Sequence, residues 1–436
     1  MLNCIWLALV IAAVVIGGCN NRLDEVVKGA FDMARSAVME IALPLSAIIT
    51  IWLGVMRLAE KSGLVLFLAR GLRPVLRRLF PEVPADHPAM GAIVMNVAAN
   101  MLGLSNAATP LGLRAMTELQ ALNPHPATAS NAMCTFLTIN TASVQLIPAT
   151  AVAILAAAGA KNPTAIVGTA LMATVVSQAV GLTAVKTLEK LPMFRVHPNL
   201  GEPTPPAPAS AARSGADETT AAAPLTRWGK ILLLLFGAFF VWLFARLLLG
   251  GDSAAPGLFP RVVRAVSLLA IPFFLSFFPL YAALRRIKVY EEFVEGAKEG
   301  FAVAIRIIPY LVTILAAVGM FRGAHGIELA ARVLKPVLDL LHFPPELLSL
   351  ALMRPLSGSG SIALVTDVVK NYGPNSIYSM MAGTILGSTE TTFYVIAVYF
   401  GSVGIRRTRH AVPAGLLADC AGVIASVIVC RMVFQP

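Results

Sequence analysis

Two carboxylates lie inside runs of apolar sequence, where an ionised side chain is costly and is a functional candidate by default. Glu390 stands in the hydroxyl-rich cluster Ser388-Thr389-Glu390-Thr391-Thr392, and Asp419 lies near the centre of the last apolar run. Hydroxyl, carboxylate and carbonyl oxygens together could hydrogen-bond a polar ligand or coordinate Na⁺. We therefore expect Glu390 and Asp419 to bind a coupling ion, H⁺ or Na⁺. The alternative is a structural ion pair with a basic residue, for which Arg354, Arg306 and Lys370 are the candidates.

Polar and glycine-rich segments interrupt the apolar sequence in two pairs. Asn96 to Thr109 pairs with Arg354 to Thr366, and Thr138 to Gln145 pairs with Gly387 to Thr392. Non-helical backbone survives at membrane depth only where it lines a cavity or is buried in protein, so we expect broken helices around a binding site. Ser357 to Ser361 could also present backbone N–H groups to an anionic or polar ligand group at the start of a half-helix.

The polar side chains of these segments are the predicted substrate-binding residues. In the first half of the chain they are Asn96, Asn100, Ser105, Asn106, Thr109, Asn140, Thr141, Ser143 and Gln145. In the second half they are Ser357, Ser359, Ser361, Ser388, Thr389, Glu390, Thr391 and Thr392. Two structural alternatives stay open, since the serine and glycine run can serve close helix packing and the asparagines can form hydrogen bonds between helices.

The composition is that of a membrane protein. Of 436 residues, 57% are hydrophobic and 13% are charged, whereas about a quarter of the residues in soluble domains are charged. The formal charge of +11 comes from Lys and Arg concentrated at the ends of apolar runs. That placement reflects membrane topology, so we expect the lipid bilayer and not nucleic acid as a partner.

No sequence motif of a known catalytic or cofactor site is present. The chain has no Walker, GxSxG or HExxH sequence and no cluster of Cys and His. We therefore expect no enzyme activity, no cofactor and no metal site. A membrane enzyme would need a reactive constellation beyond the two carboxylates.

About nine apolar runs are long enough to cross about 30 Å of hydrocarbon as helices. They are Leu2 to Gly18, Ala37 to Met56, Met133 to Ala160, Thr164 to Val185, Ile231 to Gly250, Ala265 to Leu284, Ile305 to Phe321, Tyr378 to Gly404 and Ala411 to Phe434. Two of these runs contain one of the polar segments in their middle, so these helices must position the predicted site.

The chain repeats itself across a linker. Val27-Lys28-Gly29-Ala30 is echoed by Val294-Glu295-Gly296-Ala297, and the run from Pro44 through Gly54 to Arg57 by Pro309 through Gly319 to Arg322. A stretch rich in Pro, Ala, Ser and Thr separates the repeats and has too little apolar surface to fold. We predict a first repeat over residues 1–196, a flexible linker over 197–227, two extra transmembrane helices over 228–288 and a second repeat over 289–436.

Charge predicts opposite orientations for the two repeats, because loops rich in Lys and Arg stay in the cytoplasm. The basic segment comes early in the first repeat, at Arg57 through Arg78, and late in the second, at Arg406 to His410. We predict an all-α integral membrane protein with two inverted-topology repeats and re-entrant or broken helices. It would lie in the cytoplasmic (inner) membrane with the N-terminus and the linker in the cytoplasm. Inverted repeats recur in secondary transporters, which bind substrate near the midplane.

The polar segments carry a resemblance to known families. The first half resembles spore maturation protein A in Asn96-Val97-Ala98-Ala99-Asn100-Met101-Leu102-Gly103-Leu104, in Asn106-Ala107-Ala108-Thr109-Pro110 and in Thr138-Ile139-Asn140-Thr141. The second half resembles spore maturation protein B in Arg354-Pro355-Leu356-Ser357-Gly358-Ser359-Gly360 and in Gly387-Ser388-Thr389-Glu390-Thr391-Thr392-Phe393-Tyr394. Both belong to a group named for nucleoside recognition or a gate domain, similar to gate segments of concentrative nucleoside transporters and of ferrous iron transporter B. The resemblance implies a fusion of the two proteins with a transport-like fold.

The leading hypothesis is a transporter or permease for a small polar solute, for example a nucleoside, coupled to H⁺ or Na⁺ by alternating access between the repeats. The alternative is a membrane scaffold or gating partner that transports nothing and acts in envelope or spore-like maturation. Assembly into a homo-oligomer stays open under either hypothesis.

Overall fold

The computed structural model describes residues 2–84, 86–103, 105–194, 223–249, 258–326, 329 and 343–434. Within these residues the chain is mostly helical, and the β-type pairing is limited to an isolated bridge between Thr128 and Arg407. Residues 197–222 of the predicted linker lie outside the described residues, as does the stretch 330–342 of the second repeat.

The described residues of the first half form nine α-helices and three short turns of other helix types. The α-helices are α1 (Leu2–Cys19), α2 (Leu23–Ser36), α3 (Leu43–Lys61), α4 (Leu64–Leu79), α5 (Pro88–Met101), α6 (Ser105–Ala121), α7 (Asn131–Thr141), α8 (Ala149–Ala157) and α9 (Ile166–Leu188). A π-helical turn, η1 (Ala37–Ala42), joins α2 to α3, and the 3₁₀ turns η2 (Pro163–Ala165) and η3 (Pro192–Phe194) flank α9.

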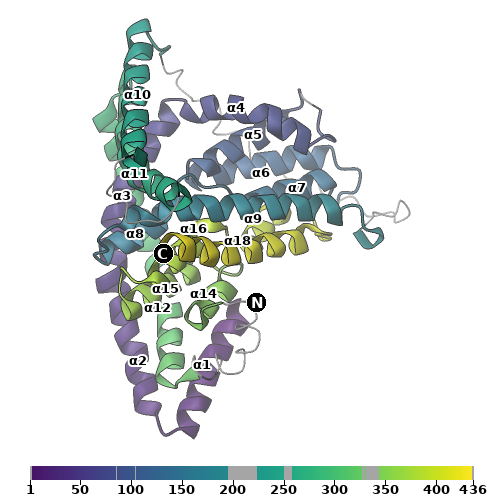
Figure 1. Cartoon of the computed structure of the whole chain (residues 1–436). Helices are drawn as coiled ribbons and strands as arrows, with labels where there is room; N and C mark the ends of the chain where they lie inside the picture. The colour runs from purple at the N-terminus through teal and green to yellow at the C-terminus, as the bar shows by residue number, and fades with distance from the viewer. Residues whose placement is uncertain are drawn as a thin grey trace.

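The described residues of the second half continue the helical pattern. They form α10 (Arg227–Leu249), α11 (Leu258–Leu284), α12 (Val289–Gly323), η4 (Pro345–Leu347), α14 (Leu348–Met353), α15 (Gly358–Tyr372), α16 (Ile377–Ser388), α17 (Thr392–Ser402) and α18 (Ala411–Phe434). The last helix lies beside α9 across the middle of the molecule (Figure 1).

Four described helices are long and apolar enough to cross a membrane: Pro163–Leu188, Arg227–Leu249, Leu258–Leu284 and Ala411–Phe434. On α10 the apolar side chains Leu234, Val241 and Leu249 expose 74%, 69% and 86% of their surface. So much apolar surface on one helix is unfavourable in water and favourable in lipid. The chain is therefore a mostly helical membrane protein.

Two of the nine apolar runs are interrupted, as the polar segments inside them predict. Met133 to Ala160 is divided into α7 and α8, with non-helical backbone over residues 142–148. Tyr378 to Gly404 is divided into α16 and α17, with extended backbone at Thr389 and Thr391. Each interruption overlaps the segment singled out for its polar residues, and the first one extends past Gln145 to Pro148.

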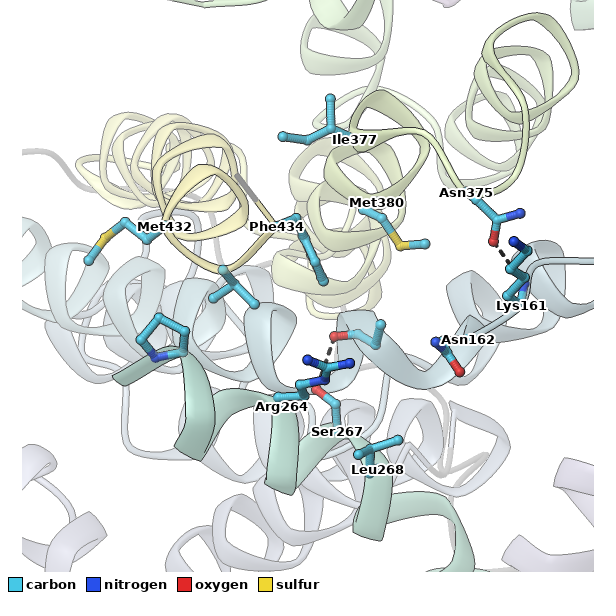
Figure 2. Close-up of a pocket in the computed structure, with 13 residues that line it drawn as sticks. Lys161, Asn162, Arg264, Ser267, Leu268, Asn375, Ile377, Met380, Met432 and Phe434 are labelled. Carbon is cyan, nitrogen blue, oxygen red and sulfur yellow. Dashed lines mark hydrogen bonds between the residues drawn. The ribbon is translucent and has the colours of Figure 1, made fainter. Parts of the chain in front are cut away.

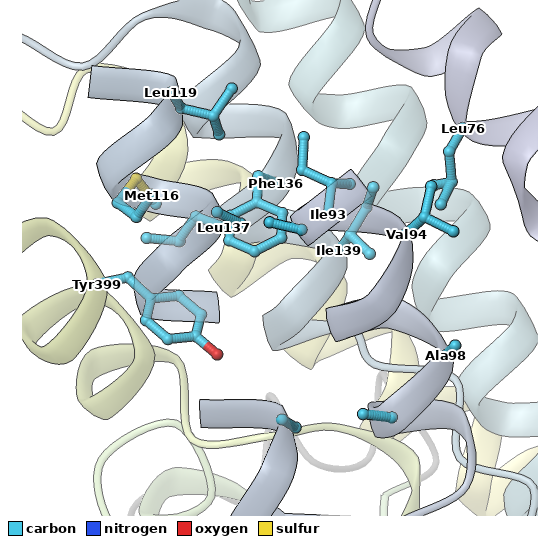
Figure 3. Close-up of a cluster of buried hydrophobic side chains, with 14 of the residues drawn as sticks. Leu76, Ile93, Val94, Ala98, Met116, Leu119, Phe136, Leu137, Ile139 and Tyr399 are labelled. Atoms are coloured by element: carbon cyan, nitrogen blue, oxygen red, sulfur yellow. The ribbon is translucent and has the colours of Figure 1, made fainter. Parts of the chain in front are cut away.

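The second part of each broken helix packs in a core built mainly by the other half of the chain. The first core combines buried residues of α5, α6 and α7 with Val395, Tyr399 and Phe400 of α17. Figure 3 shows Tyr399 beside Phe136 and Met116 in this cluster. The second core combines α14, α15 and α16 with Ile154 and its neighbours on α8. The halves thus exchange α8 and α17.

Helix α12 packs against α2 and α3 through glycines that permit close backbone contact. A Cβ atom added at Gly319 would lie 2.3 Å from the carbonyl oxygen of Gly29. A Cβ atom added at Gly296 would lie 2.6 Å from the carbonyl oxygen of Leu53 and 3.1 Å from the Cα of Gly54. These approaches leave no room for a side chain. Asp367 of α15 forms an ion pair with Arg322 at the end of α12.

Candidate functional site

A cavity of about 180 Å³ lies where four interruptions of helical structure meet. Its lining comes from both halves of the chain. From the first half come Gly103, just after α5, and residues of the α7–α8 break and the start of α8, namely Gln145 and Ile147 to Ala151. From the second half come Arg354, Gly358 and Glu390, with Ile362, Leu386 and Gly387.

Local sequence explains why the helices stop at this place. Gly103 has φ of +74°, a left-handed conformation that glycine adopts without the cost a Cβ would add, so it allows the turn after α5. Pro148 precedes α8, and proline lacks the N–H that a continuing helix would require. On the other side Ser357 caps α15, because its Oγ accepts a hydrogen bond from the Gly360 N–H at 3.0 Å.

Backbone hydrogen bonds join the breaks to one another. Within the first half the Leu146 N–H donates to the Met101 carbonyl at 3.0 Å, and within the second the Phe393 N–H donates to the Pro355 carbonyl at 3.0 Å. Between the halves, the Glu390 N–H donates to the Thr141 carbonyl at 2.8 Å. The break that carries Glu390 is therefore tied directly to the break in the first half.

The charged groups of the cavity are Arg354 and Glu390. Gln145 Nε2 donates to Glu390 Oε1 at 2.5 Å, which joins a predicted residue of each half. The buried Arg354 guanidinium donates to the Leu386 carbonyl at 3.0 Å and to Thr391 Oγ1 at 3.3 Å, whereas its Nε has no partner among the described residues. The cavity lining thus contains both a guanidinium and a carboxylate, and one guanidinium N–H has no partner among the described residues.

A cluster of amides lies beside the cavity on α5 and α7. Asn100 Nδ2 donates to Asn140 Oδ1 at 2.8 Å, and Asn96 Nδ2 donates to the Ala108 carbonyl at 2.8 Å. The Tyr399 hydroxyl is 3.4 Å from both Asn96 Nδ2 and Asn140 Oδ1. Asn96 and Asn140 are buried, and their side chains form hydrogen bonds within the protein. In the present conformation these two amides therefore have a structural role.

Asp419 forms a second polar group, on α18. Thr392 Oγ1 donates to Asp419 Oδ2 at 2.5 Å. Asp419 Oδ1 and Thr389 Oγ1 are both buried and have no partner among the described residues. Thr389 packs against Gly422, which lies about one helical turn beyond Asp419. Two oxygens without partners therefore lie close to the break between α16 and α17.

The remaining predicted residues have structural partners or lie apart from the cavity lining. Ser361 Oγ donates to the Ser357 carbonyl at 2.7 Å. The hydroxyl oxygens of Ser357 and Ser359 are 3.3 Å apart and form a hydrogen bond. Ser388 Oγ donates to the Ile385 carbonyl at 3.0 Å. The carbonyl of the buried Ser143 accepts from Thr174 Oγ1 at 2.9 Å. Thr109 lies on α6, and the side chains of Ser105 and Asn106 lie outside the described residues.

Tyr399 was not anticipated as a site residue. It lies on α17, in apolar sequence whose pattern resembles ordinary lipid-facing or core helix. Its hydroxyl reaches the amide cluster of the first half only because α17 packs in the first core. No local signal in the sequence could have indicated this contact.

The family follows from comparison with known proteins. The family model named Gate, for nucleoside recognition, matches residues 42–161 and 304–406, and these ranges contain all four interruptions. The chain belongs to this Gate family. Spore maturation protein B of Bacillus subtilis (strain 168) is 41% identical over 174 residues, which are 40% of this chain and 98% of that protein.

Spore maturation protein A of the same organism is 44% identical over 177 residues, which are 41% of this chain and 90% of that protein. The two matches cover different halves of this Gate protein. The chain therefore joins in one polypeptide two parts that resemble two separate proteins of Bacillus subtilis. These two parts are the halves that exchange α8 and α17.

Proposed function

We propose that the chain is a membrane transporter or permease for a small polar solute, which binds in the cavity where the four helix breaks meet. The observation that carries the proposal is the convergence of breaks from both halves on a cavity with Arg354, Gln145 and Glu390 in its lining. Interrupted helices at membrane depth are characteristic of transporter binding sites. A cavity of about 180 Å³ is smaller than the roughly 300 Å³ at which drug-sized sites begin. This size favours a solute smaller than a drug-sized molecule in the present conformation.

Alternating access between two inverted repeats is the mechanism that fits this site. The internal repeat pairs Gly29 with Gly296 and Gly54 with Gly319. Under that pairing, the contact between Gly29 and Gly319 corresponds to the contact between Gly296 and Gly54, and both occur. A two-fold relation between the repeats accounts for this reciprocity, as it does for the exchange of α8 and α17. Rocking of one repeat against the other would expose the cavity to each side in turn.

The proposed location is the cytoplasmic (inner) membrane. In the proposed orientation, the linker and the loop after α17 lie on the cytoplasmic side. Arg409 Nε donates to the Phe194 carbonyl at 2.8 Å, so the basic loop Arg406 to His410 lies beside the last described residue before the linker. Positive charge at one end of both α9 and α18 supports a cytoplasmic location for that end.

Ligand stabilisation of purified protein tests the solute site. We expect one class among nucleosides, small acids and other small polar solutes to stabilise the wild type, by about 2.7 kcal/mol at 100 times its Kd. In Glu390→Gln we expect binding to weaken by roughly tenfold to a hundredfold, because a hydrogen bond to a charged group contributes about 1.5–3 kcal/mol. The amide can still accept from Gln145, so the variant should fold.

Glu295→Gln is the matched control for this experiment. Glu295 is exposed on α12 and its carboxylate pairs with Lys298 at 2.9 Å, remote in sequence from the cavity lining. It should retain the wild-type shift. Equal ligand stabilisation in wild type and Glu390→Gln would contradict the assignment of the cavity.

Asp419 is the proposed coupling group. Asp419 Oδ1 and Thr389 Oγ1, which have no partner among the described residues, would supply oxygen ligands for Na⁺, or Asp419 alone would bind H⁺. We expect wild-type solute affinity to change about fivefold to 150-fold with sodium or with pH, the range of typical coupling energies, and Asp419→Asn to remove the dependence while solute still binds. Titration of solute in sodium and in choline buffers, at acidic and at neutral pH, measures both. A dependence that survives in Asp419→Asn sinks the coupling assignment.

A second candidate function is a scaffold or gating partner in envelope maturation. The names of both relatives refer to spore maturation and not to transport. This alternative predicts no solute-dependent stabilisation in the whole panel and tolerance of Glu390→Gln, so the same experiment separates the two functions.

A further inference from the structure

A second and larger pocket, of about 480 Å³, lies at one end of three candidate membrane spans. Its lining includes Arg264 near the start of α11, Phe434 at the end of α18, and Lys161 and Asn162 just before the span that begins at Pro163. None of these residues belongs to the cavity described above, which is lined from the helix breaks.

The polar part of this pocket is cationic. Arg264 and Lys161 are exposed, and no carboxylate is among the described residues that line it. The backbone N–H of Lys161 donates to Asn375 Oδ1 at 2.8 Å, which holds the loop before η2 against the start of α16. First-turn residues of α16 and of the Pro163–Leu188 span also contribute to the lining, and helix N-termini carry partial positive charge.

The other part of the pocket is apolar. Figure 2 shows Arg264 and Ser267 on α11 facing Phe434 and Met380 across the pocket. Leu268 and Met432 also line it, with 41% and 53% of their surface exposed, so the apolar wall continues to the outside of the protein. In a membrane that outer surface meets acyl chains.

We propose that this pocket binds an anionic phospholipid. The lipid phosphate would lie between Arg264 and Lys161, and an acyl chain would follow Leu268 and Met432 into the bilayer. The combination of two cations with an apolar wall at the ends of spanning helices fits an amphiphile. A free phosphate would contact the two cations but would leave the apolar wall uncovered. A bound lipid would hold α11, α18 and the start of α9 together on this side of the protein.

Native mass spectrometry of protein released from phosphatidylcholine nanodiscs, with and without phosphatidylglycerol, tests the proposal. We expect the wild type to retain phosphatidylglycerol in preference to phosphatidylcholine. The double variant Arg264→Gln with Lys161→Gln should retain it at least about tenfold less, because each substitution removes a charge-assisted hydrogen bond to the bound phosphate that cations outside the pocket do not make.

Two further variants separate the pocket from general surface charge. Arg227→Gln with Lys230→Gln removes two exposed cations of α10 and should retain lipid as the wild type does. Leu268→Trp keeps both pocket cations and should also lose the lipid, because the larger side chain occupies the apolar wall. Equal retention of the two lipids by the wild type, unchanged retention in the pocket variants, or competition by glycerol phosphate as strong as by phosphatidylglycerol would each overturn the proposal.

Discussion

Gly319→Ala is expected to destabilise the protein by about 1–3 kcal/mol or more, because the added methyl group overpacks a helix contact. Its Cβ would lie 2.3 Å from the Gly29 carbonyl oxygen and 2.7 Å from the Met33 side chain. The Gly29 oxygen belongs to the backbone of a helix, so it cannot turn aside as a side chain could. The α2–α12 contact must widen, and thermal unfolding of the purified protein should shift to lower temperature.

Gly71→Ala is the matched control for this prediction. Gly71 lies within α4, and a Cβ atom there would meet nothing within 4 Å. The same chemical change should stabilise the protein at this position by roughly 0.5–1 kcal/mol, because glycine is disfavoured inside a helix. Opposite signs for the two variants identify close backbone packing as the cause. A neutral Gly319→Ala would show that α2 and α12 do not touch as described.

Gly296→Ala extends the test to the symmetric contact. Its Cβ would lie 2.6 Å from the Leu53 carbonyl oxygen and from Arg57 Cβ. If the repeats are related by a two-fold axis, this variant should lose stability to a similar extent as Gly319→Ala. A large effect at one glycine and none at the other would argue against reciprocal packing of the repeats.

Cleavage of the linker is expected to leave the two halves bound to each other. A protease site inserted between Ala207 and Ala212 would cut a segment that no described contact requires. The α8 helix of the first half completes the second core, and α17 of the second half completes the first. After complete cleavage, a tag on the N-terminal half should retain the C-terminal half through size-exclusion chromatography.

Expression of each half alone provides the converse measurement. Without its partner, each half leaves a core unfilled and one exchanged helix without its packing surface, so we expect aggregation or rapid proteolysis. Co-expression of the two halves as separate chains should restore a stable complex. Two halves that behave as stable monomers would contradict the exchange of α8 and α17.

Local sequence was sufficient to locate the breaks and many residues beside them. Polar residues such as Glu390, Gln145 and Asn140 are too costly in the middle of a lipid-facing helix, so their positions predict interruption without knowledge of the fold. Gly103 and Pro148 act through backbone conformation, which is also a local property. The membrane character follows from composition alone.

Contacts between distant segments could be determined only from the tertiary structure. The apolar faces of α8 and α17 carry no mark of the core they enter, because hydrophobic packing is non-directional and many partners would bury the same surface. Packing between distant segments determines the exchange of these helices and the approach of Tyr399 to the amide cluster. It also brings Arg354 and Gln145 into the lining of one cavity. The sequence by itself determined a membrane protein with interrupted helices and a polar set to line them. Which polar groups share a cavity, and which are consumed by structural hydrogen bonds, was decided by shape complementarity between helices far apart in the chain.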